Sequence, residues 1–269
     1  MAQPQVFLTT HSPTVITELY TKEIFAVRSK DGTTTVQSVE AKAKNPESAQ
    51  KHLRRDPEAF LARRIAVGEG RTEQGLIRGL DDWWASIGLN SLALQGAVAI
   101  DGGGKDKAPI MCEYLLDLDH RVFLLHDTDE APNKAFLSQV RNKGGQIEGW
   151  PGECSTEQRI FLDLPWDSVC SLLKYAMESE SPDSVLAHVQ HACEDLGDVK
   201  IASLDTCAMT DSPRLRQILG RAAKSGKWFK DITRAEHLGK TIGPCLAKIR
   251  STPLAKTLAQ LRKWIDAEL

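Results

Sequence analysis

The sequence lacks the features that would place the protein outside the ordinary globular classes. No stretch comes near the roughly 18 uncharged apolar residues of a membrane-spanning helix, so we expect none. A basic segment followed by an apolar run is missing near residue 1, and we expect no secretory signal. The six cysteines form no C-x-x-C pair and the seven histidines form no H-x-x-x-H pair. We therefore expect a cytoplasmic protein with reduced thiols and no zinc site.

An excess of charge of one sign is also missing. Lys and Arg number 34 and Asp and Glu number 36, which gives a formal net charge of −2. This balance argues against a globally basic nucleic-acid-binding protein, but it leaves room for a locally basic surface. With 269 residues, 41% of them hydrophobic, the chain is long enough for one large domain or two small ones.

The first sixty residues predict a small unit that precedes the main domain. The β-branched and aromatic run Gln5–Thr10 predicts a strand, and a helix-like stretch follows at residues 14–20. Residues 24–28 and 33–39 predict a β-hairpin around Asp31-Gly32, a dipeptide typical of hairpin turns. The polar residues after 40 predict a linker or a solvated helix, with a boundary between about residues 45 and 60.

From Ile65 onward, short apolar runs alternate with helical patterns. Strands are expected at residues 65–68, 97–100, 122–125 and 145–150, and helices at residues 72–87, 108–117 and 135–142. Uninterrupted apolar strands that alternate with helices predict an α/β fold with a short parallel sheet flanked by helices. Beyond Glu157 the chain is expected to be mostly helical.

Carboxylates follow each of the first three predicted strands. The acids at these strand ends are Glu69, Glu73, Asp101, Asp106, Asp127 and Asp129. Ligands of open parallel sheets bind beyond the carboxyl ends of the strands, so we expect these side chains to converge. Such a cluster is tolerated when hard divalent cations neutralise it, and two cations can promote phosphoryl transfer. The sequence therefore predicts metal binding at this edge.

Glycines and lysines accompany the acids. The loop Gly102-Gly103-Gly104 allows close approach of the backbone to a phosphate and could supply N–H groups, and Lys105 follows it directly. Each motif alone is weak, because Asp and Gly are common in turns. Their occurrence in three successive strand–helix units is much more specific. Glu157, in Cys154-Ser-Thr-Glu, either supplies a further acid or caps a helix.

The three acidic motifs together resemble a Toprim domain, which topoisomerases, primases and some nucleases share. Residues 67–73 (VGEGRTE), 101–104 (DGGG) and 125–129 (LHDTD) are most similar to the OLD (overcoming lysogenisation defect) nucleases. The resemblance implies a Rossmann-like Toprim core at residues 62–165, completed by a helical region at residues 166–269. It also implies that the six acids bind two Mg²⁺ or Mn²⁺ ions, with Ca²⁺ as a substitute.

The N-terminal segment carries a second resemblance. Residues 5–13 (QVFLTTHSP) are similar to the strand that bears the switch histidine of ABC-type ATPases, with His11 in that role. Residues 1–45 would then be a remnant of such an ATPase domain and residues 46–61 a linker. No G-x-x-x-x-G-K-[ST] loop is present, so this chain has no complete ATP site. The resemblance implies an ATPase domain or subunit as partner.

Basic residues near the C-terminus complete the predicted site. By resemblance, a lysine neutralises the charge of the transition state, with Lys227 as the first candidate and Lys230 as the second. Glu69 would act as a general acid or base, or would serve only as a metal ligand. Arg221, Lys224 and Arg234 belong to a series from Arg214 onward whose spacing predicts a basic helical stripe for DNA phosphates. A solvated helix face is the alternative. Trp228 and Phe229 either stack on a base or pack in the core. A second basic group spans residues 51–55 and 63–64.

These features together predict a metal-dependent DNA endonuclease of the OLD type that uses two metal ions. A role in antiphage defence follows only by family analogy. One alternative is a non-catalytic or regulatory Toprim subunit of an ATPase–nuclease complex. Another is a phosphotransfer enzyme of the topoisomerase or primase type, for which Tyr20, Tyr114 and Tyr175 are the available tyrosines. Oligomerisation stays open.

Overall fold

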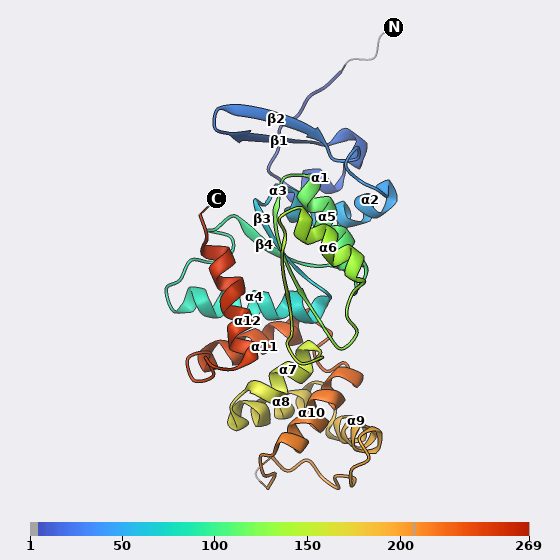
Figure 1. Cartoon of the computed structure of the whole chain (residues 1–269), viewed down its shortest axis with the longest axis vertical. Coiled ribbons are helices and arrows are strands. Elements are labelled where there is room, and N and C mark those ends of the chain that lie inside the picture. The colour runs from blue at the N-terminus through green and yellow to red at the C-terminus, as the bar shows by residue number, and fades with distance from the viewer. Residues whose placement is uncertain (1–4, 207, 269) are drawn as a thin grey trace.

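A four-stranded parallel sheet forms the centre of the fold. The computed structural model describes residues 5–206 and 208–268. Within them the sheet has the order β4-β3-β5-β6 (Figure 1), made of β3 (Arg64–Gly68), β4 (Ala97–Asp101), β5 (Arg121–His126) and β6 (Gln146–Gly149). The prediction of an α/β fold with a parallel sheet flanked by helices is confirmed.

Strands β3, β4 and β5 are mostly apolar because both faces of the sheet are covered. Successive side chains of a strand point to opposite faces, so Ile65 and Val67 join one hydrophobic cluster and Ala66 joins another. Phe123 and Leu125 of β5 lie on the face of Ala66. Each face therefore has its own core.

The face of Ile65 and Val67 is covered mainly by α2 (Pro46–Arg55), α3 (Pro57–Leu61), α5 (Lys107–Asp117) and α6 (Lys134–Asn142). The segment expected to be a linker or a solvated helix is thus α2 and α3. Asn45 caps α2, and the side chains of Ala49 and Leu53 are buried against this core. Two apolar residues four positions apart are enough to dock an otherwise polar helix.

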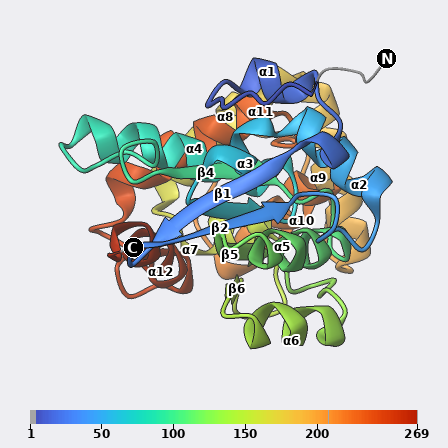
Figure 2. The ribbon, with the colours of Figure 1, turned by 90° about the horizontal axis from the view of Figure 1, so that it is seen from above.

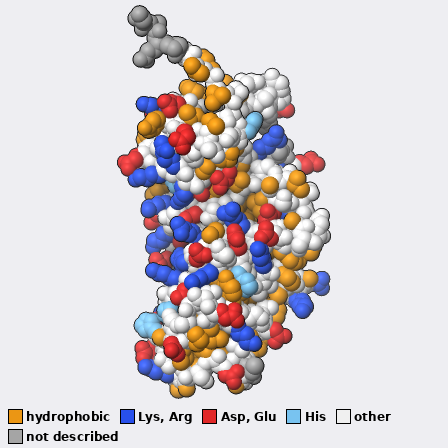
Figure 3. Space-filling view, turned by 180° about the vertical axis from the view of Figure 1, so that it is seen from behind, with side chains coloured by type: hydrophobic (Ala, Val, Ile, Leu, Met, Phe, Trp, Pro, Cys, Tyr) orange, Lys and Arg blue, Asp and Glu red, His pale blue; other side chains and the backbone are white. Residues whose placement is uncertain are grey.

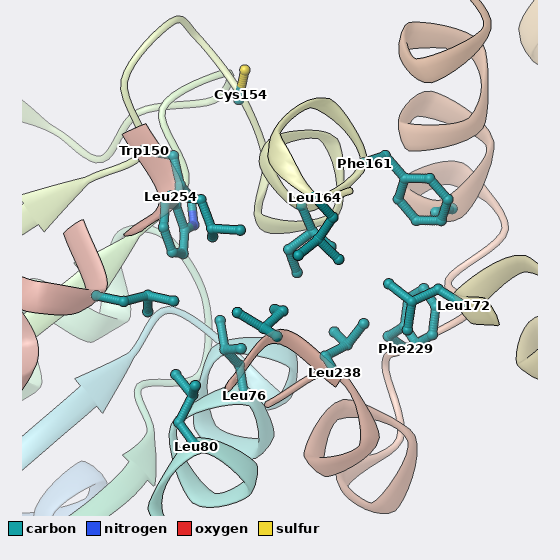
Figure 4. Close-up of a cluster of buried hydrophobic side chains, with 14 of the residues drawn as sticks. Leu76, Leu80, Trp150, Cys154, Phe161, Leu164, Leu172, Phe229, Leu238 and Leu254 are labelled. Carbon is teal, nitrogen blue, oxygen red and sulfur yellow. The ribbon is translucent and has the colours of Figure 1, made fainter. Parts of the chain in front are cut away.

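The opposite face is covered by α4 (Arg71–Ser86), α7 (Thr156–Asp163), α11 (Ile232–Ile242) and α12 (Pro253–Asp266). Figure 4 shows Leu76 and Leu80 of α4 with Leu238 of α11 in one buried cluster. Helices α4 and α11 approach unusually closely, because a Cβ atom on Gly79 would collide with the backbone of the facing helix. Glycine is required there for packing.

The remaining C-terminal helices lie at the end of the molecule opposite β1 and β2 (Figure 1): α8 (Trp166–Ser179), α9 (Pro182–Asp195) and α10 (Pro213–Ser225). The short turn η2 (Gly243–Cys245) comes directly after α11. The mostly helical C-terminal region is therefore confirmed. Helix α12 returns to the sheet, where the buried Arg64 side chain donates to the carbonyls of Ile265 and Ala267. None of the described helices combines the length and apolarity needed to cross a membrane.

The N-terminal segment agrees with the prediction in its hairpin but not in its first strand. It comprises α1 (Pro13–Thr17), η1 (Thr21–Glu23), β1 (Phe25–Lys30) and β2 (Thr33–Ser38). The hairpin turns at Asp31 and Gly32, both with positive φ, and lies across the top of the molecule (Figure 2).

The strand predicted at Gln5–Thr10 is wrong for the described residues, where this stretch pairs with no strand. Its side chains are exposed, with Val6 at 83%, Phe7 at 84% and Leu8 at 70%. The space-filling view shows hydrophobic side chains where the chain leaves its grey end (Figure 3). A β-propensity pattern becomes a strand only where a partner strand accepts its hydrogen bonds.

Candidate functional site

Glu69 and Glu73 lie at the junction of β3 and α4. Strand β3 ends at Gly68, where a Cβ atom would lie 2.6 Å from Cβ of Glu73, so glycine allows the helix to start against the strand end. The Oε2 atom of Glu73 accepts a hydrogen bond from the N–H of Gly70 at 2.7 Å. Glu73 is only 4% exposed. Its carboxylate therefore caps α4 and is also fixed at the edge of the sheet.

Asp127 joins these two acids from the end of β5. Its backbone N–H donates to Oε2 of Glu69 at 3.1 Å. The hydroxyl of the fully buried Thr156 lies 2.6 Å from Oε1 of Glu73 and 3.0 Å from Oδ1 of Asp127, and the N–H of Thr156 donates to the same Asp127 oxygen at 2.8 Å. The indole N–H of Trp150 donates to the hydroxyl at 2.6 Å. One buried threonine thus holds two of the predicted acids together.

Glu157 is a fourth member of this group. It is 4% exposed, and its carboxylate lies 3.1 Å from the hydroxyl of Ser155 and 3.5 Å from that of Thr72. Ser155, not Glu157, caps α7. The sequence left Glu157 between two roles, and the structure places it among the acids. We call Glu69, Glu73, Asp127 and Glu157 the acidic cluster.

Burial and mutual repulsion raise the pKa values of Glu69, Glu73 and Asp127. Burial, with the charge of Glu73 as the next cause, raises the pKa of Glu69 to about 7. Burial and the charges of Glu73, Glu157 and Glu69 raise the pKa of Asp127 to about 9. Burial also raises the pKa of Glu73. Near physiological pH, Asp127 is therefore mostly protonated and Glu69 partly protonated.

Across residues 5–206 and 208–268, no three or more His, Cys, Asp or Glu side chains are arranged to hold a metal ion. The contacts of the acidic cluster give the physical reason. Carboxylate oxygens accept hydrogen bonds from the N–H groups of Gly70, Asp127 and Thr156 and from the Thr156 hydroxyl, so in this arrangement the acids are oriented by these donors, and a cation would bind through the lone pairs that remain.

The other three predicted acids lie around this cluster and not inside it. Asp129 forms an ion pair with Lys224, and its charge contributes to the raised pKa of Glu69. Asp101 accepts a hydrogen bond from the N–H of Gly103 at 2.7 Å. Asp106 accepts from the N–H of Asn133 at 3.0 Å at an exposed position. The expected convergence of six acids is therefore seen for Glu69, Glu73 and Asp127, with Asp129 at the border.

The glycine loop uses its own N–H groups within the chain. Gly102 donates to the carbonyl of Gly68 at 2.8 Å, Gly103 donates to Asp101, and Gly104 donates to the carbonyl of Glu69 at 2.8 Å. The glycines lack side chains, so the loop leaves room for a phosphate. Its N–H groups already donate within the chain, however, and are not free to bind that phosphate as the sequence suggested. Lys105 beside it pairs with Glu130 at 3.2 Å.

Arg55 is a residue of this region that the motif analysis did not select. From the end of α2 its guanidinium donates to the carbonyl of Asp101, and a Cβ atom on Gly103 would lie 3.6 Å from its Nη1 atom. The sequence signal was the basic group at residues 51–55. Its importance was hidden because that stretch was expected to be a linker.

The predicted lysines occupy different positions. The charge of Lys230 lowers the raised pKa of Glu69. Lys227 and Lys230 are both exposed, and among the described residues neither side chain has a hydrogen bond or ion pair. The effect of its charge on Glu69 is what distinguishes Lys230 from Lys227, which the sequence placed first. Trp228 and Phe229 are both fully buried, so packing and not base stacking is their role.

The predicted basic stripe on one helix is wrong. Helix α10 ends at Ser225 and α11 begins at Ile232, so the basic residues belong to two helices. Arg221 pairs with Asp195 at 3.2 Å, and Arg234 forms an ion pair with Glu180. Arg214 and Arg216 likewise pair with Asp198 and Asp211. Acidic neighbours thus pair with every residue of the series except Lys227 and Lys230 among the described residues.

His11 lies at an exposed position one residue before Ser12, the N-cap of α1.

Comparison with known proteins finds no matching family model, no matching curated protein and no matching solved structure. What the chain does is therefore indicated by its own residues and their contacts.

Proposed function

We propose that this chain is a metal-dependent DNA endonuclease of the OLD type, with a Toprim core that uses two Mg²⁺ or Mn²⁺ ions. The observation that carries the proposal is the acidic cluster. Glu69, Glu73 and Asp127 meet at the carboxyl ends of β3 and β5, where Thr156 links two of them and Glu157 joins them. An edge of this kind is where parallel α/β sheets bind their ligands.

The chemistry of the acidic cluster fits hard divalent cations. All its donors are carboxylate oxygens, which Mg²⁺ and Mn²⁺ prefer. The pKa values of Glu69 and Asp127 are raised, and neither carboxylate forms an ion pair among the described residues. A cation that binds these carboxylates would therefore displace protons and would not have to break an ion pair. The four acids of the cluster would hold the ions, with Asp129 available once Lys224 releases it. Bound cations would supply an activated water and neutralise charge on the phosphodiester.

The protein groups around the acids have complementary roles in this proposal. Glu69, with a pKa of about 7, is suited to accept or return a proton near neutral pH. Lys230, whose charge acts on Glu69, would stabilise negative charge on the attacked phosphate. Lys224 would exchange Asp129 for the DNA backbone as phosphates approach.

The tyrosine-dependent alternative finds less support. Tyr114 is buried and its hydroxyl donates to the carbonyl of Val39 at 2.9 Å. Burial raises the pKa of Tyr114, which makes it a poor nucleophile. Tyr175 stacks on His237 with 3.8 Å between ring centroids. An endonuclease that attacks with water needs none of these residues.

The ATPase partner remains part of the proposal. The exposed apolar run Val6-Phe7-Leu8 is a surface that a partner domain or subunit would cover. It lies shortly before His11, the residue that, by resemblance, would contact the γ-phosphate of ATP. Full activity of the nuclease would then require the ATPase.

Cleavage of supercoiled plasmid tests the proposal. The wild type is incubated with Mg²⁺, Mn²⁺, Ca²⁺ or EDTA and compared with Glu73→Ala and Asp127→Ala, and Asp183→Ala serves as an exposed-acid control. We expect metal-dependent nicking or linearisation that both cluster variants lose and the control retains. Cleavage that survives both cluster substitutions contradicts the site. A wild type that is inactive with every metal, alone and with an added ATPase partner, contradicts the function and favours a regulatory subunit.

A further inference from the structure

A cavity of about 400 Å³ lies on the other side of the glycine loop, between α2, α5 and α6. Its wall is largely apolar, with Ala49 and Met111 buried in the wall and Ile110 and Phe136 closer to the surface. The volume lies within the range of small-molecule sites. None of the residues of the acidic cluster lines it.

One end of the cavity is basic and adjoins the glycine loop. Lys107 lines the cavity, and its side chain also packs on the loop, since a Cβ atom on Gly103 would lie 3.7 Å from Cδ of Lys107. The Nη1 atom of Arg55 lies 3.6 Å from the same Cβ position, and the guanidinium also pairs with Asp56 at 2.6 Å. Among the described residues no acid lies within ion-pair distance of Lys107. Gly103 and Gly104, both with positive φ, leave space between these cations.

The other end of the cavity is polar and nearly neutral. Glu113 is buried there and pairs with Lys44 at 2.7 Å and with Lys143 at 2.9 Å. Gln139 also lines this part. The cavity thus runs from a cationic end, through an apolar middle, to a set of hydrogen-bond donors and acceptors.

We propose that this cavity binds a nucleoside monophosphate, either free or as the terminal nucleotide of a DNA strand. The phosphate would lie between Lys107 and Arg55, the base would lie against the apolar wall, and the edge of the base would meet Glu113 and Gln139. The choice of a nucleotide rests on the proposed nuclease function, whereas the cavity and its charges do not. A bound nucleotide would touch the loop that Gly104 ties to the backbone of Glu69.

Isothermal titration calorimetry of the full chain in EDTA tests the inference. The probes are deoxyadenosine monophosphate, deoxyadenosine and inorganic phosphate, and excess EDTA removes any contribution of metal ions at the acidic cluster. Binding of the monophosphate should exceed that of either fragment by at least about tenfold, because only the whole ligand meets both ends. No binding of the monophosphate at millimolar concentration overturns the inference.

Variants locate the site. Ile110→Trp fills the mouth of the cavity and Lys107→Glu reverses charge at the phosphate end; each should weaken monophosphate binding by about tenfold or more. Lys134→Glu, the same charge change at an exposed position of α6, should leave binding within about twofold. Equal binding by all variants places the nucleotide elsewhere and refutes the assignment. Should Ile110→Trp fail to fold, Lys107→Glu decides alone.

A short DNA duplex with a 5′-phosphate, compared with the same duplex without it, distinguishes the two sources of the ligand. A Lys107-dependent preference for the phosphorylated end identifies a strand terminus, and binding of the monophosphate alone identifies a free nucleotide. Monophosphate binding in a protein that cleaves no plasmid would leave this inference standing and remove the proposed function. Plasmid cleavage without monophosphate binding would do the reverse.

Discussion

Replacing Asp127 with asparagine should stabilise the metal-free protein at alkaline pH. Asparagine keeps the shape of the side chain and the oxygen that accepts the N–H of Thr156, but it carries no charge. In the wild type the folded state raises the pKa of Asp127 to about 9. The stability that this group contributes is therefore complete below the ordinary carboxyl pKa and is lost as pH rises toward about 9.

The magnitude follows from the pKa shift. Each pKa unit is worth about 1.4 kcal/mol, and pH 8 lies about 4 units above the ordinary carboxyl pKa of 3.8, so the ceiling near pH 8 is about 6 kcal/mol. Proton sharing with Glu73 and partial hydration of the site reduce this ceiling, and we expect Asp127→Asn to gain about 3 kcal/mol over the wild type near pH 8. At about 2–4 °C per kcal/mol for a chain of this size, the melting temperature should rise by roughly 10 °C. Near pH 4 the two proteins should melt within about 2 °C of each other.

Thermal unfolding followed by circular dichroism in EDTA between about pH 4 and pH 9 measures this difference. Asp106→Asn is the matched control, because Asp106 is exposed and its replacement should change stability by less than about 0.5 kcal/mol at every pH. The same measurement with added magnesium is a second test. Magnesium should raise the melting temperature of the wild type near pH 8 and should change the melting temperature of Asp127→Asn very little. Parallel curves for wild type and Asp127→Asn across the whole pH range would refute the reasoning.

Three further predictions concern packing, positioning and catalysis. Gly79→Leu should cost about 3 kcal/mol, seen as a lower melting temperature, because the added side chain has no room between α4 and α11; an unchanged melting temperature contradicts that packing. Thr156→Val should lose about 2 kcal/mol, because it leaves the indole N–H of Trp150 without an acceptor, whereas Thr156→Ser should retain stability; equal losses in denaturant unfolding would argue against the hydrogen bond. In the plasmid assay, Lys230→Ala should lower the rate by about 100-fold and Lys227→Ala by less than about threefold, and the reverse order would restore the sequence-based assignment.

The sheet could be predicted because β3, β4 and β5 are each a short apolar run closed by an acid or a glycine. Val67 and Ile100 show no alternation with polar residues, which is typical of strands buried on both faces. The positions of Glu69 and Asp127 at strand ends then follow from the sheet alone. Glu157 required more, because its approach to these acids depends on how α7 returns to the sheet.

The basic stripe could not be predicted because linear spacing carries no information about a break between two helices. Lys227, in a left-handed conformation, lies in that break between α10 and α11. The acid that neutralises Arg221 comes from α9, twenty-six residues earlier in the chain. Spacing within one segment cannot reveal a partner that only tertiary structure supplies. The same is true of Arg55, whose contact with the glycine loop depends on the docking of α2.

The anchoring of α12 to the start of β3 bears on how the chain is made. The hydrogen bond from Arg64 to the carbonyl of Ile265 spans 201 residues, and Phe123 of the sheet packs against Trp264 with ring centroids 5.5 Å apart. During synthesis, β3 and β5 leave the ribosome long before the helices that cover this face. Their apolar side chains stay uncovered in the meantime, which slows folding and exposes the nascent chain to aggregation. The protein is therefore expected to depend on chaperones that shield the sheet until translation reaches α11 and α12.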